Sequence, residues 1–292
     1  MNTPCAVTAP IHRRSKRRPL GLLINVGGCA ALLYFMVQTI TSDPRIAQGF
    51  LASSIAGAAT GLGAFVLPFV RRLQLPQIGR FMAFGGGMML AAALVPLLTP
   101  AFAMSVRAWA WDVLLAMALG ASTMSLLNRL LPHLHAAPQS DEGSLPVNAL
   151  WLMVVAIAVH NLPEGFAVGA GFSGSDTMGW RTAVSIALQN IPEGLIVASA
   201  LWSLKLPRAI AALGALLTGL VEPLGAVIGG VLAISSEAAL PAALGFAGAA
   251  MIYIVMHELL PEANRLIHSR RQTAQIFVST TVLVGLVMHW AD

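Results

Sequence analysis

The chain has 292 residues, of which 57% are hydrophobic and only 10% are charged, whereas charged residues make up about 25% of a typical globular domain. So few polar groups cannot cover a folded surface in water. The composition therefore excludes a soluble protein and predicts one whose solvent is lipid. The two cysteines, Cys5 and Cys29, argue against a disulfide framework. They also exclude a zinc site built from cysteine, which needs about four clustered ligands.

Nine apolar segments of about 20 residues follow one another along the sequence, and each is long enough to cross a bilayer as a helix. They lie at about 20–40, 47–70, 79–99, 109–131, 149–172, 181–203, 207–232, 241–262 and 274–291. Because the connections are short, we predict an all-α, polytopic membrane helix bundle. Its expected parts are a basic N-terminus at 1–19, an additional N-terminal helix at 20–40 and an eight-helix domain at 41–292.

The first apolar segment has two interpretations. Its basic start at 12–18 (HRRSKRR) is typical of a secretory signal peptide. However, the apolar stretch is longer than a usual signal core, and no clear small-residue cleavage site precedes Asp43. We therefore expect a retained helix, with cleavage as the alternative.

The positions of lysine and arginine orient the chain. If the N-terminus is cytoplasmic, fourteen basic residues lie at cytoplasmic helix ends and three at outer ends. The cytoplasmic set is Arg13, Arg14, Lys16, Arg17, Arg18, Arg71, Arg72, Arg80, Arg129, Lys205, Arg208, Arg265, Arg270 and Arg271, and the outer set is Arg45, Arg107 and Arg181. This bias follows the positive-inside rule, so we expect a cytoplasmic N-terminus and an outer C-terminus. The net charge of +5 is then a topology signal and not a nucleic-acid footprint.

The longest polar segment, at about 132–148, falls on the expected cytoplasmic side and contains His133 and His135. Two histidines could receive a metal ion there. A plain solvated loop is the simpler interpretation.

Four carboxylates fall inside the expected spans, namely Glu164, Glu193, Glu222 and Glu258. A charged side chain at mid-bilayer costs at least about 2.5–3.5 kcal/mol on insertion scales. No lysine or arginine lies at a comparable depth to pair with these glutamates. Unpaired carboxylates in lipid either stay protonated or bind cations, so the four glutamates predict a cation path.

Two of these glutamates belong to a motif that occurs twice, at 160–165 (HNLPEG) and at 189–194 (QNIPEG). The first polar residue of each copy lies four positions before the glutamate, so the two side chains share one helix face. The polar residues of the two copies are His160, Asn161, Glu164, Gln189, Asn190 and Glu193. Because successive helices cross the membrane in opposite directions, the two copies predict an inverted-repeat architecture.

The proline and glycine of each copy favour a functional interpretation. Pro163 and Pro192 remove a backbone donor and leave carbonyl groups that need new partners, while Gly165 and Gly194 permit close helix packing. A kinked helix with a protonated, hydrogen-bonded glutamate is the simpler alternative for a single copy. Two copies with carboxylate, amide and imidazole groups favour a divalent-metal site, for Zn(II), Fe(II), Mn(II) or Cd(II).

Five further residues are weaker candidates for the same path. Glu222 precedes a proline and is expected to reach the site from a third helix. His257 and Glu258 are adjacent, so their side chains point about 100° apart on a helix and one of them is expected to face the path. Glu262 is either an exit ligand or a capping charge. Met82 offers a thioether, whose ordinary role is packing.

These motifs resemble those of the ZIP (Zrt-, Irt-like) family of divalent metal transporters. The resemblance rests on the two Pro-Glu-Gly helices, on His257-Glu258 in the penultimate segment and on eight spans from about residue 47 to the end. The additional N-terminal segment is similar to a helix of some bacterial members. The resemblance implies uptake of zinc, or of cadmium, iron or manganese, through a bacterial inner membrane by alternating access. The metal is then the substrate, and no resident cofactor is expected.

The family's central site, which is often binuclear, carries over to this sequence through its motif residues. The implied metal ligands are His160, Asn161, Glu164, Gln189, Asn190, Glu193 and Glu222, with Met82 as a weaker transfer. Gln189 departs from the pattern, because many members carry histidine there. Gln189 and Asn190 both lower the charge of the site, so the number of bound metals and the preferred metal stay open. A homodimer is implied as well.

Two other functions fit parts of the sequence. His257-Glu258 is compatible with an intramembrane metalloprotease, but the motif His-Glu-x-x-His is absent because residues 261 and 262 are proline and glutamate. A membrane sensor that binds metal without moving it is the other alternative. We expect no enzymatic activity, and we expect divalent metal ions, the lipid bilayer and a second copy of the chain as partners.

Overall fold

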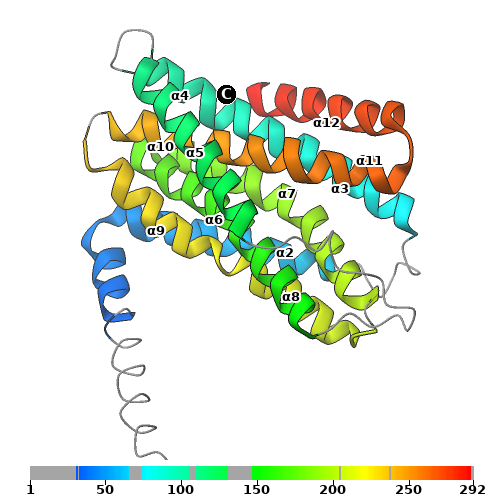
Figure 1. Cartoon of the computed structure of the whole chain (residues 1–292). Helices are drawn as coiled ribbons and strands as arrows, with labels where there is room; N and C mark the ends of the chain where they lie inside the picture. The colour runs from blue at the N-terminus through cyan, green and yellow to red at the C-terminus, as the bar shows by residue number, and fades with distance from the viewer. Residues whose placement is uncertain are drawn as a thin grey trace, which may run out of the picture. The chain divides into compact units, whose positions relative to one another are not determined.

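The computed structural model describes residues 31, 33–65, 74–105, 110–130, 147–203, 205–236 and 238–290. Contacts divide the chain between Thr39 and Ile40, and the second unit carries all the numbered helices (Figure 1). These are α2 (Pro44–Ala64), α3 (Leu75–Ala92), η1 (Ala93–Leu98), α4 (Thr99–Met104), α5 (Trp111–Leu130), α6 (Val147–Gly174), α7 (Asp176–Ser203), α8 (Arg208–Gly219), α9 (Glu222–Ala233), α10 (Ala239–Ile254), η4 (Val255–Leu259), α11 (Leu260–Ile267) and α12 (Arg270–Trp290). The described residues form helices and no strands, which confirms the all-α prediction. Most of the expected helix at 20–40, and His133 and His135, lie outside the described residues.

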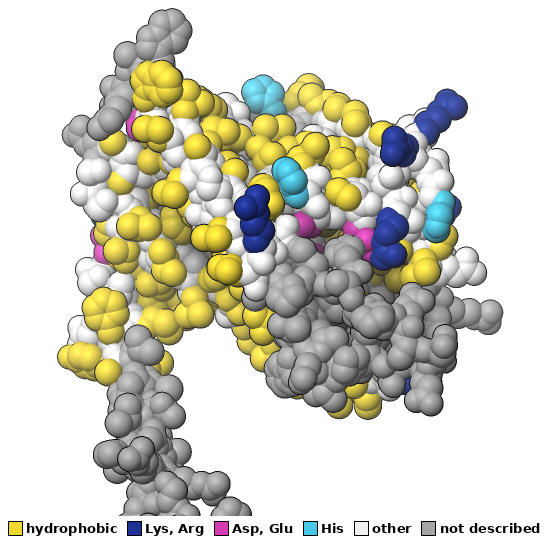
Figure 2. All heavy atoms as spheres, viewed as in Figure 1, with side chains coloured by type: hydrophobic (Ala, Val, Ile, Leu, Met, Phe, Trp, Pro, Cys, Tyr) yellow, Lys and Arg dark blue, Asp and Glu magenta, His cyan; other side chains and the backbone are white. Residues whose placement is uncertain are grey.

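Six described helical stretches are long and apolar enough to cross a membrane. They are Leu75–Met104, Trp111–Leu130, Asp176–Trp202, Arg208–Ala233, Ala239–Ile267 and Arg270–Trp290. Each coincides with an expected span, and α2 and α6 occupy two further expected positions. Large apolar side chains such as Leu115 and Leu286 are exposed, and hydrophobic side chains dominate much of the face in Figure 2. These observations confirm a multi-pass membrane protein.

The described basic residues gather at one end of the helices. Helix connections alternate between two ends, and one end carries the α7–α8 and α11–α12 connections (Figure 1). Seven lysines and arginines lie toward that end, namely Arg80, Arg129, Lys205, Arg208, Arg265, Arg270 and Arg271. Arg45 and Arg181 lie toward the other end. This distribution is the one that the alternating spans predicted.

The closest backbone contacts sort the helices into two groups. The first bundle consists of α2, α6, α7, α8 and α9, and the second bundle consists of α3, η1, α4, α5, α10, η4, α11 and α12. A Cβ at Gly165 would overlap the carbonyl oxygen of Glu222 on α9, and one at Gly120 would overlap that of Phe246 on α10. Every described glycine whose added Cβ would overlap a carbonyl oxygen in this way faces a helix of its own bundle. Gly85 faces the other bundle, and a Cβ there would lie 3.8 Å from the Pro192 side chain, which is an ordinary contact distance.

Prolines interrupt three spans that the sequence alone predicts as continuous helices. The span expected at 207–232 breaks at 220–221, because Pro223 lacks the N–H that would bond the carbonyl of Gly219. The break places Glu222 in the first turn of α9, at the positive end of its dipole. The π-helical segment η1 contains Pro96, and the π-helical segment η4 ends just before Pro261. Such segments are frequent at functional sites.

Candidate metal centre

The two motif helices meet through their glutamine and glutamate. Both α6 and α7 run through their internal prolines without interruption. Gln189 Nε2 of α7 donates a hydrogen bond of 2.6 Å to Glu164 Oε1 of α6. The Glu164 side chain is completely buried and Gln189 is 2% exposed. The two copies of the motif therefore face each other inside the first bundle, as the inverted repeat predicted.

Glu222 joins this group from α9, and α2 supplies a backbone group. Asn190 Nδ2 donates to Glu222 Oε1 at 2.6 Å and to the carbonyl oxygen of Ala56 at 2.8 Å. Both N–H groups of the Asn190 amide are thus in use, because a side-chain amide has two donors. The Ala56 carbonyl was not anticipated, since a backbone acceptor leaves no signal in the residue type at its position.

Several buried polar atoms of the motifs and of Glu222 lack a hydrogen-bonding partner among the described residues. They are Asn161 Nδ2 and Oδ1, Glu164 Oε2, Gln189 Oε1, Asn190 Oδ1 and Glu222 Oε2. A buried polar group without a partner costs about 1–3 kcal/mol, so a cluster of them requires a physical explanation. Five of the six atoms are oxygens. Carboxylate and amide oxygens can coordinate a divalent cation.

Glu193 and His160 extend the group toward the second bundle. Glu193 of α7 is close enough to His160, Glu164 and Glu222 for electrostatic interaction with each of them. His160 Nε2 lies 3.0 Å from Glu258 Oε2 of η4, so this contact links the two bundles. A cavity of about 10 Å³ borders Glu193 and Gln189, which is close to the smallest volume that holds one water molecule.

The weaker candidates separate in the structure. Glu258 points to His160, whereas His257 is exposed and stacks on Tyr253 of its own helix at 4.2 Å, so the two side chains diverge as predicted. Arg265 Nε donates to Glu262 Oε2 at 2.7 Å, which gives this glutamate a local ion pair.

The structure places a different methionine beside the motifs. Met82 packs against an apolar cluster that includes Ala263 and Ile267 of α11. Met89, two turns further along α3, lines the small cavity with Gln189 and Glu193. Apolar spacing on α3 does not distinguish between the two methionines, because seven residues separate them and they share a helix face.

In this arrangement the carboxylates of Glu164 and Glu222 accept hydrogen bonds from side-chain amides. Within the described ranges, no three His, Cys, Asp or Glu side chains are grouped closely enough to hold a metal as they stand. Gln189 instead bonds one oxygen of Glu164, and Asn190 bonds one oxygen of Glu222. A cation that binds here must use the second carboxylate oxygens and amide oxygens, or displace the amide N–H groups.

The helices cross the membrane and bring buried carboxylates and amides together with an imidazole. This arrangement defines a polytopic membrane protein with an internal polar site, and such sites bind or move ions.

A family model described as "ZIP Zinc transporter" matches residues 144–289. The chain is 38% identical to the zinc transporter GufA of Myxococcus xanthus over 74% of its length and 89% of the relative. It is 34% identical to the zinc transporter ZIPB of Bordetella bronchiseptica over 100% of its length and 97% of the relative. The chain therefore belongs to the ZIP zinc transporter family.

Proposed function

We propose that this protein carries divalent transition metal ions, with zinc as the foremost substrate, across the cell membrane into the cytoplasm. The observation that carries the proposal is that two fully buried carboxylates, Glu164 and Glu222, lie on different helices and bond the amides of the second motif, which also carries the partly buried Glu193. Its relatives in Myxococcus and Bordetella are named zinc transporters, which supports zinc as the substrate. The basic residues at one helix end mark the side of the membrane that we take as cytoplasmic.

Purified protein in sealed liposomes provides the test. Zinc added outside should enter protein-containing liposomes and should not enter empty ones, and cadmium, iron and manganese added in excess should compete according to their affinity. Saturable binding without flux would instead support a metal sensor. Metal-dependent cleavage of a membrane peptide would support the metalloprotease.

The side chains that could coordinate a cation form two groups, and one of them should bind a cation more tightly than the other. Near His160, the oxygens of Glu164, Glu193 and Gln189 are ligands of the kind that zinc accepts. On the other side, Asn190 commits both N–H groups to Glu222 and Ala56 and keeps only Oδ1 for a cation. The first group has two carboxylates and an imidazole against one carboxylate in the second, so one ion should be held there.

We expect one zinc ion per chain at saturation, measured by equilibrium dialysis and elemental analysis of the full-length protein. The Asn190→Asp variant replaces a donating amide by a carboxylate, so it should bind a second ion at higher zinc concentrations. Two ions of similar affinity in the unchanged protein, or no second ion in Asn190→Asp, would contradict this division of the site.

Transport further requires that the site open to each side in turn, and two rigid groups of helices are suited to this. Close backbone contacts hold each bundle together, while the His160–Glu258 contact across the bundles is made by side chains and Gly85 leaves room for a Cβ 3.8 Å from the Pro192 side chain. We propose that the first bundle, which carries the metal ligands, moves against the second.

Cross-linking the two bundles should stop transport. A Cβ at Gly174 of α6 would lie 3.2 Å from the Leu240 side chain of α10. With Cys5 and Cys29 replaced by serine, Gly174→Cys plus Leu240→Cys joined by a short reducible cross-linker should lose zinc flux, and a reductant should restore it. The matched pair within the first bundle, Ile46→Cys plus Gly230→Cys, should keep its flux when cross-linked. Equal flux in both cross-linked proteins would rule out relative motion of the bundles.

A further inference from the structure

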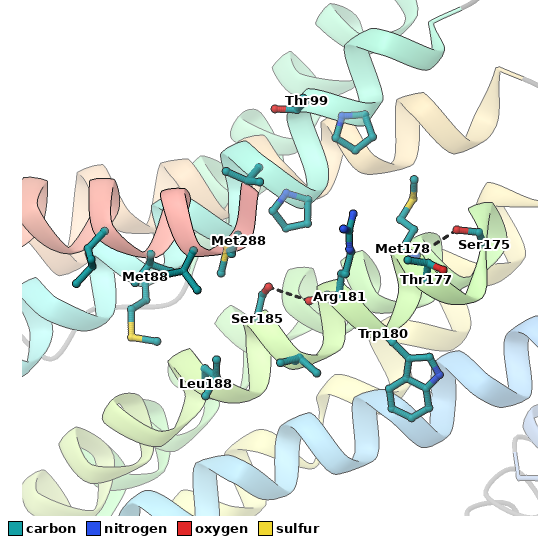
Figure 3. Close-up of a pocket in the computed structure, with 17 residues that line it drawn as sticks. Met88, Thr99, Ser175, Thr177, Met178, Trp180, Arg181, Ser185, Leu188 and Met288 are labelled. Carbon is teal, nitrogen blue, oxygen red and sulfur yellow. Dashed lines mark hydrogen bonds between the residues drawn. The ribbon is translucent and has the colours of Figure 1, made fainter. Parts of the chain in front are cut away.

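A large groove on the other side of α7 is not used by the metal site. It has a volume of about 740 Å³ and lies between α7 of the first bundle and η1, α4 and α12 of the second (Figure 3). Binding sites for small molecules typically measure about 300–1,000 Å³. The groove therefore has room for a ligand at a place where the two bundles face each other.

The polarity of the lining changes along α7. Ser175, Thr177 and Arg181 line the end near the start of the helix, and Figure 3 shows Arg181 extending from α7 toward the opposite helices. Further along, the lining is apolar, with Val184 and Leu188 exposed on α7. Across the groove, α12 contributes Val287 and Met288, which are also apolar.

The depth of Arg181 matches the boundary between headgroups and hydrocarbon. The span Asp176–Trp202 has 27 residues and is about 40 Å long, the thickness of a bilayer with its headgroups. Arg181 lies five residues inside this span, or about 7.5 Å from its start. Trp180, which also lines the groove, is a residue type that gathers at this interface.

We infer that this groove binds one glycerophospholipid with an anionic headgroup. The phosphate lies at Arg181, beside the hydroxyl groups of Ser175 and Thr177, and an acyl chain follows Val184 and Leu188 into the membrane. The guanidinium matches the phosphate in geometry and sign, and charge complementarity favours an anionic headgroup over a zwitterionic one, whose ammonium group the guanidinium repels. The lipid contacts α7 and α12 together, so it lies between the two bundles. The inference does not depend on which ion the metal site takes.

A photoactivatable phosphatidylglycerol with its reactive group on an acyl chain tests this in liposomes that contain the full-length protein. Cross-links should concentrate on groove residues of α7, η1 and α12, and excess phosphatidylglycerol should compete better than phosphatidylcholine. Arg181→Gln should abolish that preference between headgroups. Cross-links spread evenly over all lipid-facing helices would overturn the proposal, as would cross-links confined to other surfaces because a protein segment covers the groove.

A matched pair of tryptophan variants separates the groove from ordinary lipid contact. Val184 in the groove and Val278 on α12 outside it are both 54% exposed. Val184→Trp should lower the yield of groove cross-links at least about tenfold, which corresponds to about 1.4 kcal/mol of binding, and Val278→Trp should leave it unchanged. Equal yields in the two variants would show that the lipid is not specifically bound.

Discussion

Replacing Glu164 and Glu193 together by alanine is expected to reduce zinc uptake into liposomes at least about 100-fold, since each tenfold loss of affinity corresponds to about 1.4 kcal/mol and two anionic ligands are removed. Of the motif residues that remain near His160, Gln189 offers only a neutral amide oxygen, and Glu258 is the one described carboxylate in contact with His160. The measurement is the initial rate of zinc entry at a fixed outside concentration. A normal elution volume in detergent must accompany the loss, so that misfolding is excluded as its cause.

Glu262 provides the matched control for this result. It is also a glutamate in a membrane-spanning stretch, but its partner is Arg265 on its own helix. Glu262→Gln should keep the initial rate within about twofold, because its ion pair is made with a largely exposed Arg265 and such pairs contribute at most about 1 kcal/mol. If this variant lost uptake to the same extent as the double alanine variant, the loss would no longer identify the buried group as the ion site.

The Gly165→Ala variant is expected to be strongly destabilised. The added Cβ would overlap the carbonyl oxygen of Glu222, which is backbone and cannot turn aside. Overpacking of a core commonly costs about 1–3 kcal/mol, and here the α6–α9 contact must widen. Thermal unfolding in detergent should show a lower midpoint and a lower yield of monodisperse protein.

Gly85→Ala is the control for this substitution. A Cβ at Gly85 would lie 3.8 Å from the Pro192 side chain, which is an ordinary contact distance. Alanine in a helix interior is favoured over glycine by about 0.5–1 kcal/mol, so the unfolding midpoint should stay equal or rise. A midpoint for Gly165→Ala as high as that for Gly85→Ala would contradict the close packing of α6 on α9.

The spans and the polar pairs of the motifs could be predicted from sequence because each depends on a regular spacing. Apolar runs of about 20 residues predicted the crossing helices, and spacing by four predicted one shared helix face for the polar residues of each motif copy, with Glu164 on the first and Gln189 on the second. The hydrogen bond between these two residues agrees with that prediction. The expectation that Glu222 would join from a third helix agrees with its contact to Asn190.

Other features depend on tertiary contacts that no local pattern encodes. The break before Glu222 and the π-helical segment at His257 and Glu258 follow from prolines, but a proline alone does not decide between a kink, a break and a wider turn. Met89 rather than Met82 borders Glu193 because of how α3 packs on α7. The Ala56 carbonyl serves Asn190 only because α2 packs closely on α7.

The most direct test of the central claim is a crystal of the full-length protein soaked with zinc and measured at the zinc absorption edge. The account predicts one strong anomalous peak beside His160, within coordination distance of oxygens of Glu164 and Glu193, at about 2.0–2.2 Å. A peak confined to exposed groups such as His257, with no peak among the buried carboxylates, would contradict it.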